Sequence, residues 1–321
     1  MRVAKTTALV LAALAALVAA GRPASGQEFP TRPINLIIPF GPGGSSDLTT
    51  RTFIGLAPEV LGQPMVVHLK PGGGGAIGSE FVAQAKPDGY TLLVGHPNCN
   101  TILPAMEGRS KGPDDLVPVC RINTQGALFL GHPGAPFKDL KEMIAWAKAN
   151  PGKLSVSSAG TWSVPDFVWK QMEHMLGLKL RIVSYDGGAE ALVALLGGHV
   201  QASLLSPTQS LPHVRAGKVR ALAYFGERRF AELPELPTAK EQGYEPVPLT
   251  VWKGILAPKG TPRPVVEKLA ASFKKMFEAK PARDALKQLG DEFDYQGPEE
   301  FEKFWRAEFQ TYKELGKIFK R

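Results

Sequence analysis

Residues 39–47 read PFGPGGSSD and join an apolar run at 34–38, which predicts a strand, to a helical pattern that begins directly afterwards. The stretch is rich in Gly and Pro, and Ser45, Ser46 and Asp47 at its end are candidate helix caps. A glycine turn from a strand into a helix leaves backbone N–H groups unpaired and directed at one spot, where the helix dipole also favours negative charge. These nine residues therefore predict a small anion site.

The same arrangement recurs along the chain. Residues 66–79 read VVHLKPGGGGAIGS, again a strand, a run of glycines and a helix start, and two such loops in tandem indicate one cleft. Two more loops resemble them: SAGTWSVPD at 158–166, where Thr161 and Ser163 offer hydroxyls, and YDGGAEA at 185–191. Four loops of this kind, at the ends of strands, predict a ligand held between two lobes.

Strands and helices alternate twice, which predicts an α/β protein with a mainly parallel sheet in each half. Strands are expected at 34–38, 65–69 and 90–94, and then at 154–157, 180–183 and 202–205. A polar loop is expected at 101–115, and the chain is expected to cross between lobes near 117–130 and again after 219–225. The prediction assigns residues 27–124 and 226–321 to lobe 1 and residues 125–225 to lobe 2. Ligands of such sheets bind at the carboxyl ends of the strands.

The first 26 residues have the features of a secretory signal peptide. Arg2 and Lys5 precede an uncharged run at 6–20 that is short for a membrane span, and small residues follow up to Gly26. We expect a periplasmic protein that begins near Gln27. Export permits a disulfide between Cys99 and Cys120, and two separate buried thiols are the alternative.

Composition and motifs exclude several classes of protein. The hydrophobic fraction of 44% and the charged fraction of 21% are those of a globular chain. Removing residues 1–26 leaves 35 basic and 30 acidic residues, a mild excess that suits small anions and forms no stripe for nucleic acid. The string GGGAIG at 73–78 matches GxGxxG, but the next strand ends without the acidic residue that would hold a ribose. Catalytic and metal-binding motifs are missing, so no enzyme, metal or cofactor is expected.

The ordered segments PFGPGGSSD, KPGGGGAIGS, PDGYTLLVG, SAGTWS, YDGGAEALVALLGGHV, LPELPTAKEQGYE and VWKGILAPKGTP resemble the solute-binding proteins of tripartite tricarboxylate transporters, the Bug receptors. The resemblance covers nearly the whole chain after residue 26. It implies a type II periplasmic-binding-protein fold whose two lobes close over a small carboxylate and deliver it to membrane permease subunits. It also implies that main-chain amides, hydroxyls and bridging waters hold the carboxylate. We expect a monomer.

The resemblance and the strand-end loops together define the candidate ligand-binding residues. The resemblance assigns this role to Gly43, Ser45, Ser46, Asp47, Gly74, Gly75, Ala76, Gly78, Gly160, Thr161 and Ser163. The loops at the strand ends add His96, Asn98, Ser158, Trp162, Asp166, Tyr185, Gly188 and Ala189.

Two of these residues depart from the pattern expected of the family. Where GxGSxxH is expected, this chain has GTWSVPD, with Trp162 at a glycine position and Asp166 at a histidine position. An indole that faces the cleft would favour a flat or aromatic acid, whereas an indole packed under the lobe would not touch the ligand. A carboxylate of Asp166 near the cleft would repel a second ligand carboxylate and so favour a singly charged, hydroxylated or amino acid.

Two other functions remain open at this stage. An extracytoplasmic enzyme would use Asp47, Asp166 or His96 as its acid or base. A sensory partner would present the bound ligand to a receptor ectodomain instead of a transporter.

Overall fold

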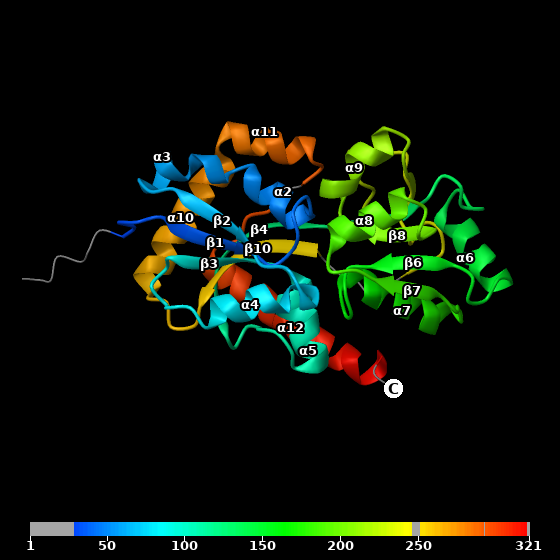
Figure 1. Ribbon diagram of the computed structural model, residues 1–321, viewed down its shortest axis with the longest axis horizontal. Helices are drawn as coiled ribbons and strands as arrows, with labels where there is room; N and C mark the ends of the chain where they lie inside the picture. The colour runs from blue at the N-terminus through cyan, green and yellow to red at the C-terminus, as the bar shows by residue number, and fades with distance from the viewer. Residues whose placement is uncertain (1–28, 246–250, 292, 320–321) are drawn as a thin grey trace, which may run out of the picture.

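The computed structural model describes residues 29–245, 251–291 and 293–319, so the expected signal peptide lies outside the described residues. Two five-stranded sheets lie side by side (Figure 1), with the orders β2-β1-β3-β10-β4 and β7-β6-β8-β5-β9. In each sheet three strands run parallel, and a fourth, β10 or β5, pairs antiparallel with its two neighbours. The predicted two-lobed α/β fold is confirmed.

The strands of the first sheet are β1 (Ile34–Ile38), β2 (Met65–Leu69), β3 (Thr91–Gly95), β4 (Leu116–Gln125) and β10 (Val251–Pro258). Those of the second are β5 (Ala127–Gly131), β6 (Ser155–Ser158), β7 (Arg181–Ser184), β8 (Ala202–Leu205) and β9 (Arg220–Phe225). The first lobe has the helices α2 (Ser45–Arg51), α3 (Ala57–Leu61), α4 (Ala76–Ala83), α5 (Leu103–Glu107), α10 (Arg263–Glu278), α11 (Lys280–Gln288) and α12 (Pro298–Phe319), with short helical turns at Ile54–Leu56, Gly73–Gly75 and Asn98–Ile102. The second has α6 (Leu140–Ala149), α7 (Val164–Leu176), α8 (Gly188–Leu196) and α9 (Pro207–Arg215). No described helix is long and apolar enough to cross a membrane.

Alternation along each strand places helices on both faces of each sheet. In β1, Ile34, Leu36 and Ile38 pack with α3 and α10 on one face, while Ile37 packs with α4 and α12 on the other. In β5 of the second sheet, Phe129 packs with α6 and α7 on one face, and Leu128 packs with α8 and α9 on the other. The central strands are therefore buried on two sides, which explains the apolar runs in β1, β3, β5 and β8.

The first crossing between the sheets is a single residue. Gly126 alone separates β4 from β5, and a Cβ atom there would lie 2.2 Å from the carbonyl oxygen of Phe225. Only glycine fits at this point, because a contact below 3.0 Å would force the backbone to move. The two lobes are thus joined at a closely packed position.

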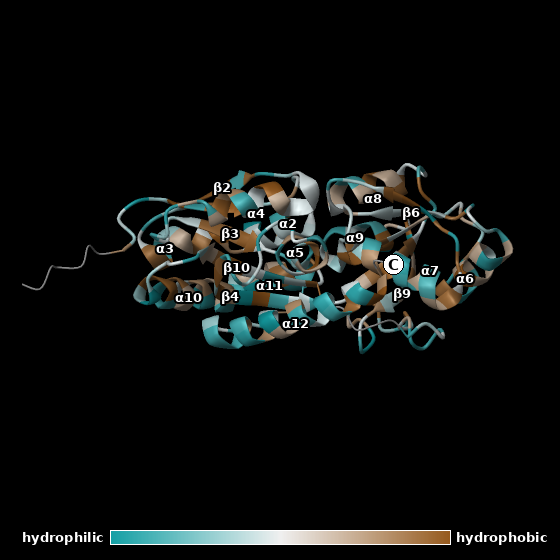
Figure 2. Cartoon of the chain, turned by 90° about the horizontal axis from the view of Figure 1, so that it is seen from below, coloured by the Kyte–Doolittle hydropathy of each residue, from teal (hydrophilic) through white to brown (hydrophobic). Residues whose placement is uncertain are grey.

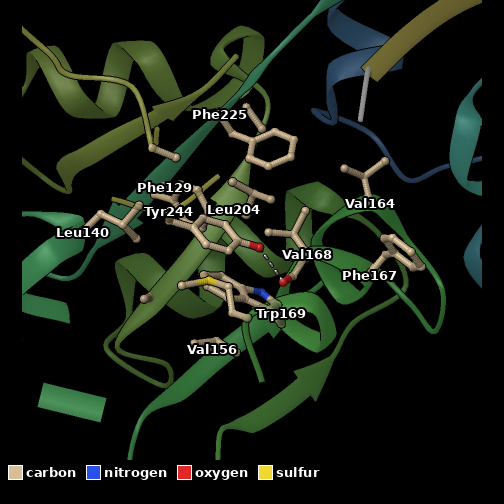
Figure 3. Packing of buried hydrophobic residues seen from close by; sticks show 14 of the residues in the cluster. Phe129, Leu140, Val156, Val164, Phe167, Val168, Trp169, Leu204, Phe225 and Tyr244 are labelled. Atoms are coloured by element: carbon tan, nitrogen blue, oxygen red, sulfur yellow. Dashed lines mark hydrogen bonds between the residues drawn. The ribbon is translucent and has the colours of Figure 1, made fainter. Parts of the chain in front are cut away.

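The return to the first lobe comes later than the expected residue 226. Phe230 and Tyr244 are buried in the cores of the second lobe, and the Tyr244 hydroxyl donates to the carbonyl of Val168 at 3.5 Å (Figure 3). Thr238 also forms a bridge with Tyr224 of β9. Burial of these aromatic rings keeps residues up to 245 on the second lobe, so the expected assignment of residues from 226 onward to the first lobe is wrong for this segment.

The C-terminal helix connects the two lobes. Phe301 and Trp305 of α12 pack in the first lobe, as expected, but the helix continues beneath the second lobe (Figure 2). There the rings of Tyr312 and Phe319 lie 5.5 and 5.1 Å from the ring of Phe167 in α7. The expected polar loop at 101–115 instead contains α5, because its apolar side chains are buried in the same cluster as Tyr312.

Cys99 and Cys120 are free and completely buried, so the disulfide alternative is wrong and the alternative of two separate thiols is confirmed. Cys120 packs in the core of the first lobe, whereas the Cys99 sulfur donates to the Asn100 side chain at 3.2 Å. Burial raises the pKa of Cys99 to about 12 and also raises the pKa of Cys120. Neither thiol is therefore ionised near neutral pH.

Candidate functional site

Two cavities lie between the lobes. The first, which we call the inner cavity, has a volume of about 60 Å³. Its lining residues are Phe40, Gly44, Ser45, Ser46, His96, Asn98, Ala127, Ala159, Val164, Pro165, Gly188, Leu204, Leu205, Ser206, Gln209 and Val251. The second, the outer cavity, has about 370 Å³ and is lined by Gly73, Gly74, Leu103, Arg109, Gly160, Thr161, Ser184, Tyr185, Asp186 and Glu190.

The loop at 39–47 supplies polar groups to the inner cavity. The hydroxyl of Ser46 is buried, with the residue 2% exposed, and has no hydrogen-bond partner among the described residues. The N–H of Ser45 donates to Oε1 of Gln209 in the opposite lobe at 3.0 Å. Asp47 is structural, because its carboxylate accepts from the N–H of Gly43 at 2.9 Å and pairs with Arg51 at 2.9 Å. A ligand oxygen in this cavity can therefore meet Ser46 directly, whereas Asp47 and Gly43 hold the loop.

His96 adds a neutral donor. Its ring is 7% exposed, lies at the end of β3 and meets the ring of Phe40 edge to face at 5.2 Å. Burial, with a smaller contribution from the charge of Lys253, lowers the pKa of His96 from 6.5 to about 3. Nδ1 accepts from the N–H of Asn98 at 3.2 Å, so in the neutral ring the proton is on Nε2. His96 is thus a hydrogen-bond donor without charge and too weak a base for catalysis near pH 7.

Contacts across the cleft show that the lobes are closed. The side-chain oxygen of Asn98 accepts from the N–H of Val164 at 2.9 Å, which joins the end of β3 to the start of α7. A Cβ atom on Gly160 would lie 3.2 Å from the Cα atom of Gly74, so the two glycine loops touch backbone to backbone. Gly160, with φ of +105°, also has a conformation that side chains rarely allow.

The expected site residues divide into three groups. Ser45, Ser46, His96, Asn98 and Gly188 line the inner cavity, and Gly74, Gly160, Thr161 and Tyr185 line the outer one. The remaining candidates line neither cavity: Gly43, Asp47, Gly75, Ala76, Gly78, Ser158, Trp162, Ser163, Asp166 and Ala189.

Packing explains several residues of the third group. Gly75 and Gly78 are required because a Cβ atom would lie 2.9 Å from the Cβ of Cys99 and from the carbonyl of Lys70, respectively. Ser158 bonds to Ser184 at 3.1 Å, and Ser163 caps α7 by accepting from the N–H of Asp166 at 3.3 Å. These residues shape the loops around the cavities without lining them.

Of the two alternatives for Trp162, the structure favours the one in which the indole is packed away from the cavities. Its indole is 8% exposed, lines neither cavity and donates from Nε1 to Oε1 of Glu107 at 2.7 Å. The ammonium of Lys170 lies 3.9 Å from the ring centroid. Asp166 does not face the cavity either, because its carboxylate accepts from the N–H of Trp162 at 2.8 Å and pairs with Lys170 at 2.7 Å. The repulsion expected between Asp166 and a second ligand carboxylate is therefore unsupported.

Sequence reasoning missed a buried ion pair close to the inner cavity. Lys253 of β10 is 0% exposed, and its Nζ lies 3.0 and 3.1 Å from the oxygens of Asp291 and 3.3 Å from Oγ1 of Thr208. Thr49 and Asn123 also donate to Asp291. Desolvation lowers the pKa of Lys253, and the charge of Asp291 opposes this shift. The signal available in the sequence was a lysine within an otherwise apolar strand.

The two lobes, the closed cleft and its lining of neutral donors define a solute-binding protein of the periplasmic type. Residues 51–319 match the family described as the tripartite tricarboxylate transporter family receptor, and the chain belongs to this family. The chain is similar to the UPF0065 protein in the gbd 5' region of Cupriavidus necator, at 37% identity over 301 residues that cover 92% of this chain and 90% of the relative. It is also 32% identical over 275 residues to BugT of Bordetella pertussis, covering 84% and 83%.

Solved structures agree with this assignment. The periplasmic binding protein BugD superposes with a TM-score of 0.85 at 31% identity, covering 91% of this chain and 98% of BugD. MatC from Rhodopseudomonas palustris with bound malate has a TM-score of 0.85 at 29% identity, covering 90% and 100%. A further R. palustris protein with adipate has a TM-score of 0.85 at 26% identity, covering 91% of this chain and 98% of that protein.

Proposed function

We propose that this chain is a periplasmic receptor that captures a small carboxylate between its lobes and delivers it to the permease of a tripartite tricarboxylate-type transporter. The observation that carries the proposal is the buried hydroxyl of Ser46, which has no partner among the residues that the structure describes and lines the same cavity as the neutral imidazole of His96. An anion held by such uncharged donors can be released again when the cleft opens. The malate and adipate in the related structures support a carboxylate as the ligand.

Hinge closure is the proposed mechanism. A ligand that contacts both walls of the inner cavity would stabilise the contacts between lobes, such as those of Ser45 with Gln209 and of Asn98 with Val164. The proposal includes a monomer exported with a cleaved signal peptide. Its first lobe boundary, expected at 124/125, is proposed at Gly126, the single residue between β4 and β5.

Thermal unfolding with a panel of carboxylates tests the proposal. A ligand at 100 times its Kd should add about 2.7 kcal/mol to the free energy of unfolding. Ser46→Ala should weaken binding at least about tenfold, because a hydrogen bond to a charged group contributes roughly 1.5–3 kcal/mol. Ser272→Ala is the matched control, since Ser272 is 7% exposed and bonds within α10. A panel without any shift would reject the carboxylate receptor.

The alternative functions have distinct outcomes. Catalysis is disfavoured because Asp47 and Asp166 are paired with cations and the pKa of His96 is lowered to about 3. Consumption of a bound acid during long incubation would nevertheless identify an enzyme. A response to the ligand in cells that lack the permease would identify a sensory partner.

A further inference from the structure

The inner cavity has a polar wall and an apolar wall. From this asymmetry we infer that the ligand has a single carboxylate and a compact apolar remainder. This inference rests on the proposed function and narrows the class of acid. Trp162 and Asp166, from which the sequence favours a singly charged acid, line neither cavity, so the single charge of the ligand depends here on the cavity lining alone.

The polar wall belongs to the first lobe. Ser45 and Ser46 follow β1, and His96 and Asn98 follow β3, so all four lie where neighbouring parallel strands end. The Ser46 hydroxyl has no partner among the described residues, and the Nε2 proton of neutral His96 is a second donor. These groups suit one carboxylate.

The apolar wall belongs to the second lobe and to the strands that cross between lobes. Ala127, Val164, Leu204, Leu205 and Val251 each line the cavity and are at most 6% exposed. A second carboxylate placed against these side chains would lose its hydration without gaining donors, whereas a hydrocarbon group would be favoured.

Two polar side chains on this side of the cavity, those of Gln209 and Ser206, each have a hydrogen-bond partner. Oε1 of Gln209 accepts from Ser45, and the hydroxyl of Ser206 donates to Thr208 at 3.1 Å. Among the described residues, no Lys, Arg, Asp or Glu lines the inner cavity. The nearby ammonium of Lys253 is paired with Asp291. The wall therefore offers no cation for a second anionic group.

The outer cavity is separated from the inner one in the closed protein. No described residue lines both cavities. A Cβ atom added to Gly75 would lie 3.1 Å from the ring of Phe40, and one added to Gly160 would lie 3.2 Å from the Cα atom of Gly74, so little space is left between the two cavities. A diacid in the inner cavity could not place its second carboxylate near Arg109, and Asp186 and Glu190 would repel it there.

Size gives the same result. The inner cavity of about 60 Å³ is much smaller than the outer cavity of about 370 Å³, which favours a short acid. Isobutyrate and benzoate are therefore suitable probes, one compact and one flat. Succinate, malate and adipate, which each carry two carboxylates, are the diacids for comparison.

Calorimetry at one pH and ionic strength compares these five acids. We expect isobutyrate or benzoate to bind at least tenfold more tightly than every diacid. A diacid that binds as tightly or more tightly overturns the inference but leaves the carboxylate receptor intact. If none of the five binds, the inference is rejected together with its basis in the proposed function.

A variant of the apolar wall provides a second test. Val251→Thr keeps the shape of the side chain but exchanges a methyl group for a hydroxyl, so the affinity for the apolar acid should fall about tenfold. Val193→Thr, at a position that is 67% exposed in α8, is the control. Ala127→Ser repeats the test if circular dichroism shows that Val251→Thr does not fold. An unchanged affinity for the apolar acid in a folded variant overturns the inference.

Discussion

Trp162 has a backbone conformation that glycine adopts at no steric cost. Its φ of +56° is unusual for a bulky residue, and such strain persists only where the surroundings determine it. Here the N–H bonds to Asp166, the ring lies under Lys170, and the indole N–H reaches Glu107 in the other lobe. Trp162 is therefore a contact between lobes and not a surface for the ligand.

Trp162→Phe should remove the hydrogen bond to the Glu107 carboxylate while keeping an aromatic ring under Lys170, and so destabilise the closed form by roughly 1.5–3 kcal/mol and weaken ligand binding at least about tenfold. Glu107→Gln in the Trp162→Phe background should then have little additional effect. Calorimetry of the double-mutant cycle measures this coupling. Trp146→Phe, in α6, is the control. Losses that simply add would show that the two side chains act independently.

His96 predicts a pH dependence of stability. Its pKa is lowered from 6.5 to about 3 by burial, so between these values the unfolded chain binds a proton that the folded protein does not. The contribution of neutral His96 to the free energy of unfolding is fully present above pH 6.5. It falls by about 1.4 kcal/mol per pH unit as the pH is lowered toward 3. Urea unfolding from pH 4 to 7 should show a shallower dependence for His96→Gln. Its control, exposed His199→Gln, should match the wild type, and equal slopes for all three proteins would contradict the assignment.

At the scale of elements, β10 is held by a buried ion pair as well as by its two neighbouring strands. Lys253 and Asp291 are both completely buried at the side chain, and Thr208 at the start of α9 joins them. Because Thr208 belongs to the second lobe, the network links the two lobes. The buried ammonium of Lys253 is therefore balanced by the buried carboxylate of Asp291.

Removing one partner of this pair should be costly. Asp291→Asn leaves a buried ammonium without its counter-charge and should lower the free energy of unfolding by about 3–5 kcal/mol. Lys253→Met in the Asp291→Asn background should recover part of that loss. Urea unfolding measures both effects, and Lys280→Met, in an exposed pair with Asp284, should change stability by less than about 1 kcal/mol. A double variant as unstable as the sum of the single variants would argue against a coupled pair.

At the scale of the whole molecule, the main chain and the C-terminal helix connect the lobes. The chain crosses at Gly126 and again between β9 and β10, while α12 extends from the first lobe to α7 of the second. Closure therefore takes place between lobes that these connections already join. Hydrogen bonds between the lobes, such as that of Trp162 with Glu107, are those that opening must break.

The buried thiols report on the integrity of the entire fold. Cys99 and Cys120 are both 0% exposed, and burial raises the pKa of each. A thiol reagent at pH 8 should modify neither cysteine in the folded protein and both after unfolding in denaturant. The intact mass should be the same with and without reductant. A mass increase of two hydrogens on reduction would instead reveal a disulfide.

The sequence by itself determined the elements and the position of the cleft. Three strands, β1, β2 and β8, have the predicted bounds, because apolar runs bounded by glycine turns are local signals. The polar wall was also predictable, since Ser45, Ser46, His96 and Asn98 follow strands whose carboxyl ends meet at one edge.

Only the tertiary structure decided where the side chains of the loops point and which of them meet. Trp162 bonds to Glu107, which is 55 residues away in the sequence. Lys253 bonds to Asp291 at a separation of 38 residues, and Ser45 to Gln209 at a separation of 164. Local periodicity does not encode such pairings, because they depend on how the two lobes close on each other. The same reason separates Cys99 from Cys120 and directs the indole of Trp162 away from the ligand cavity.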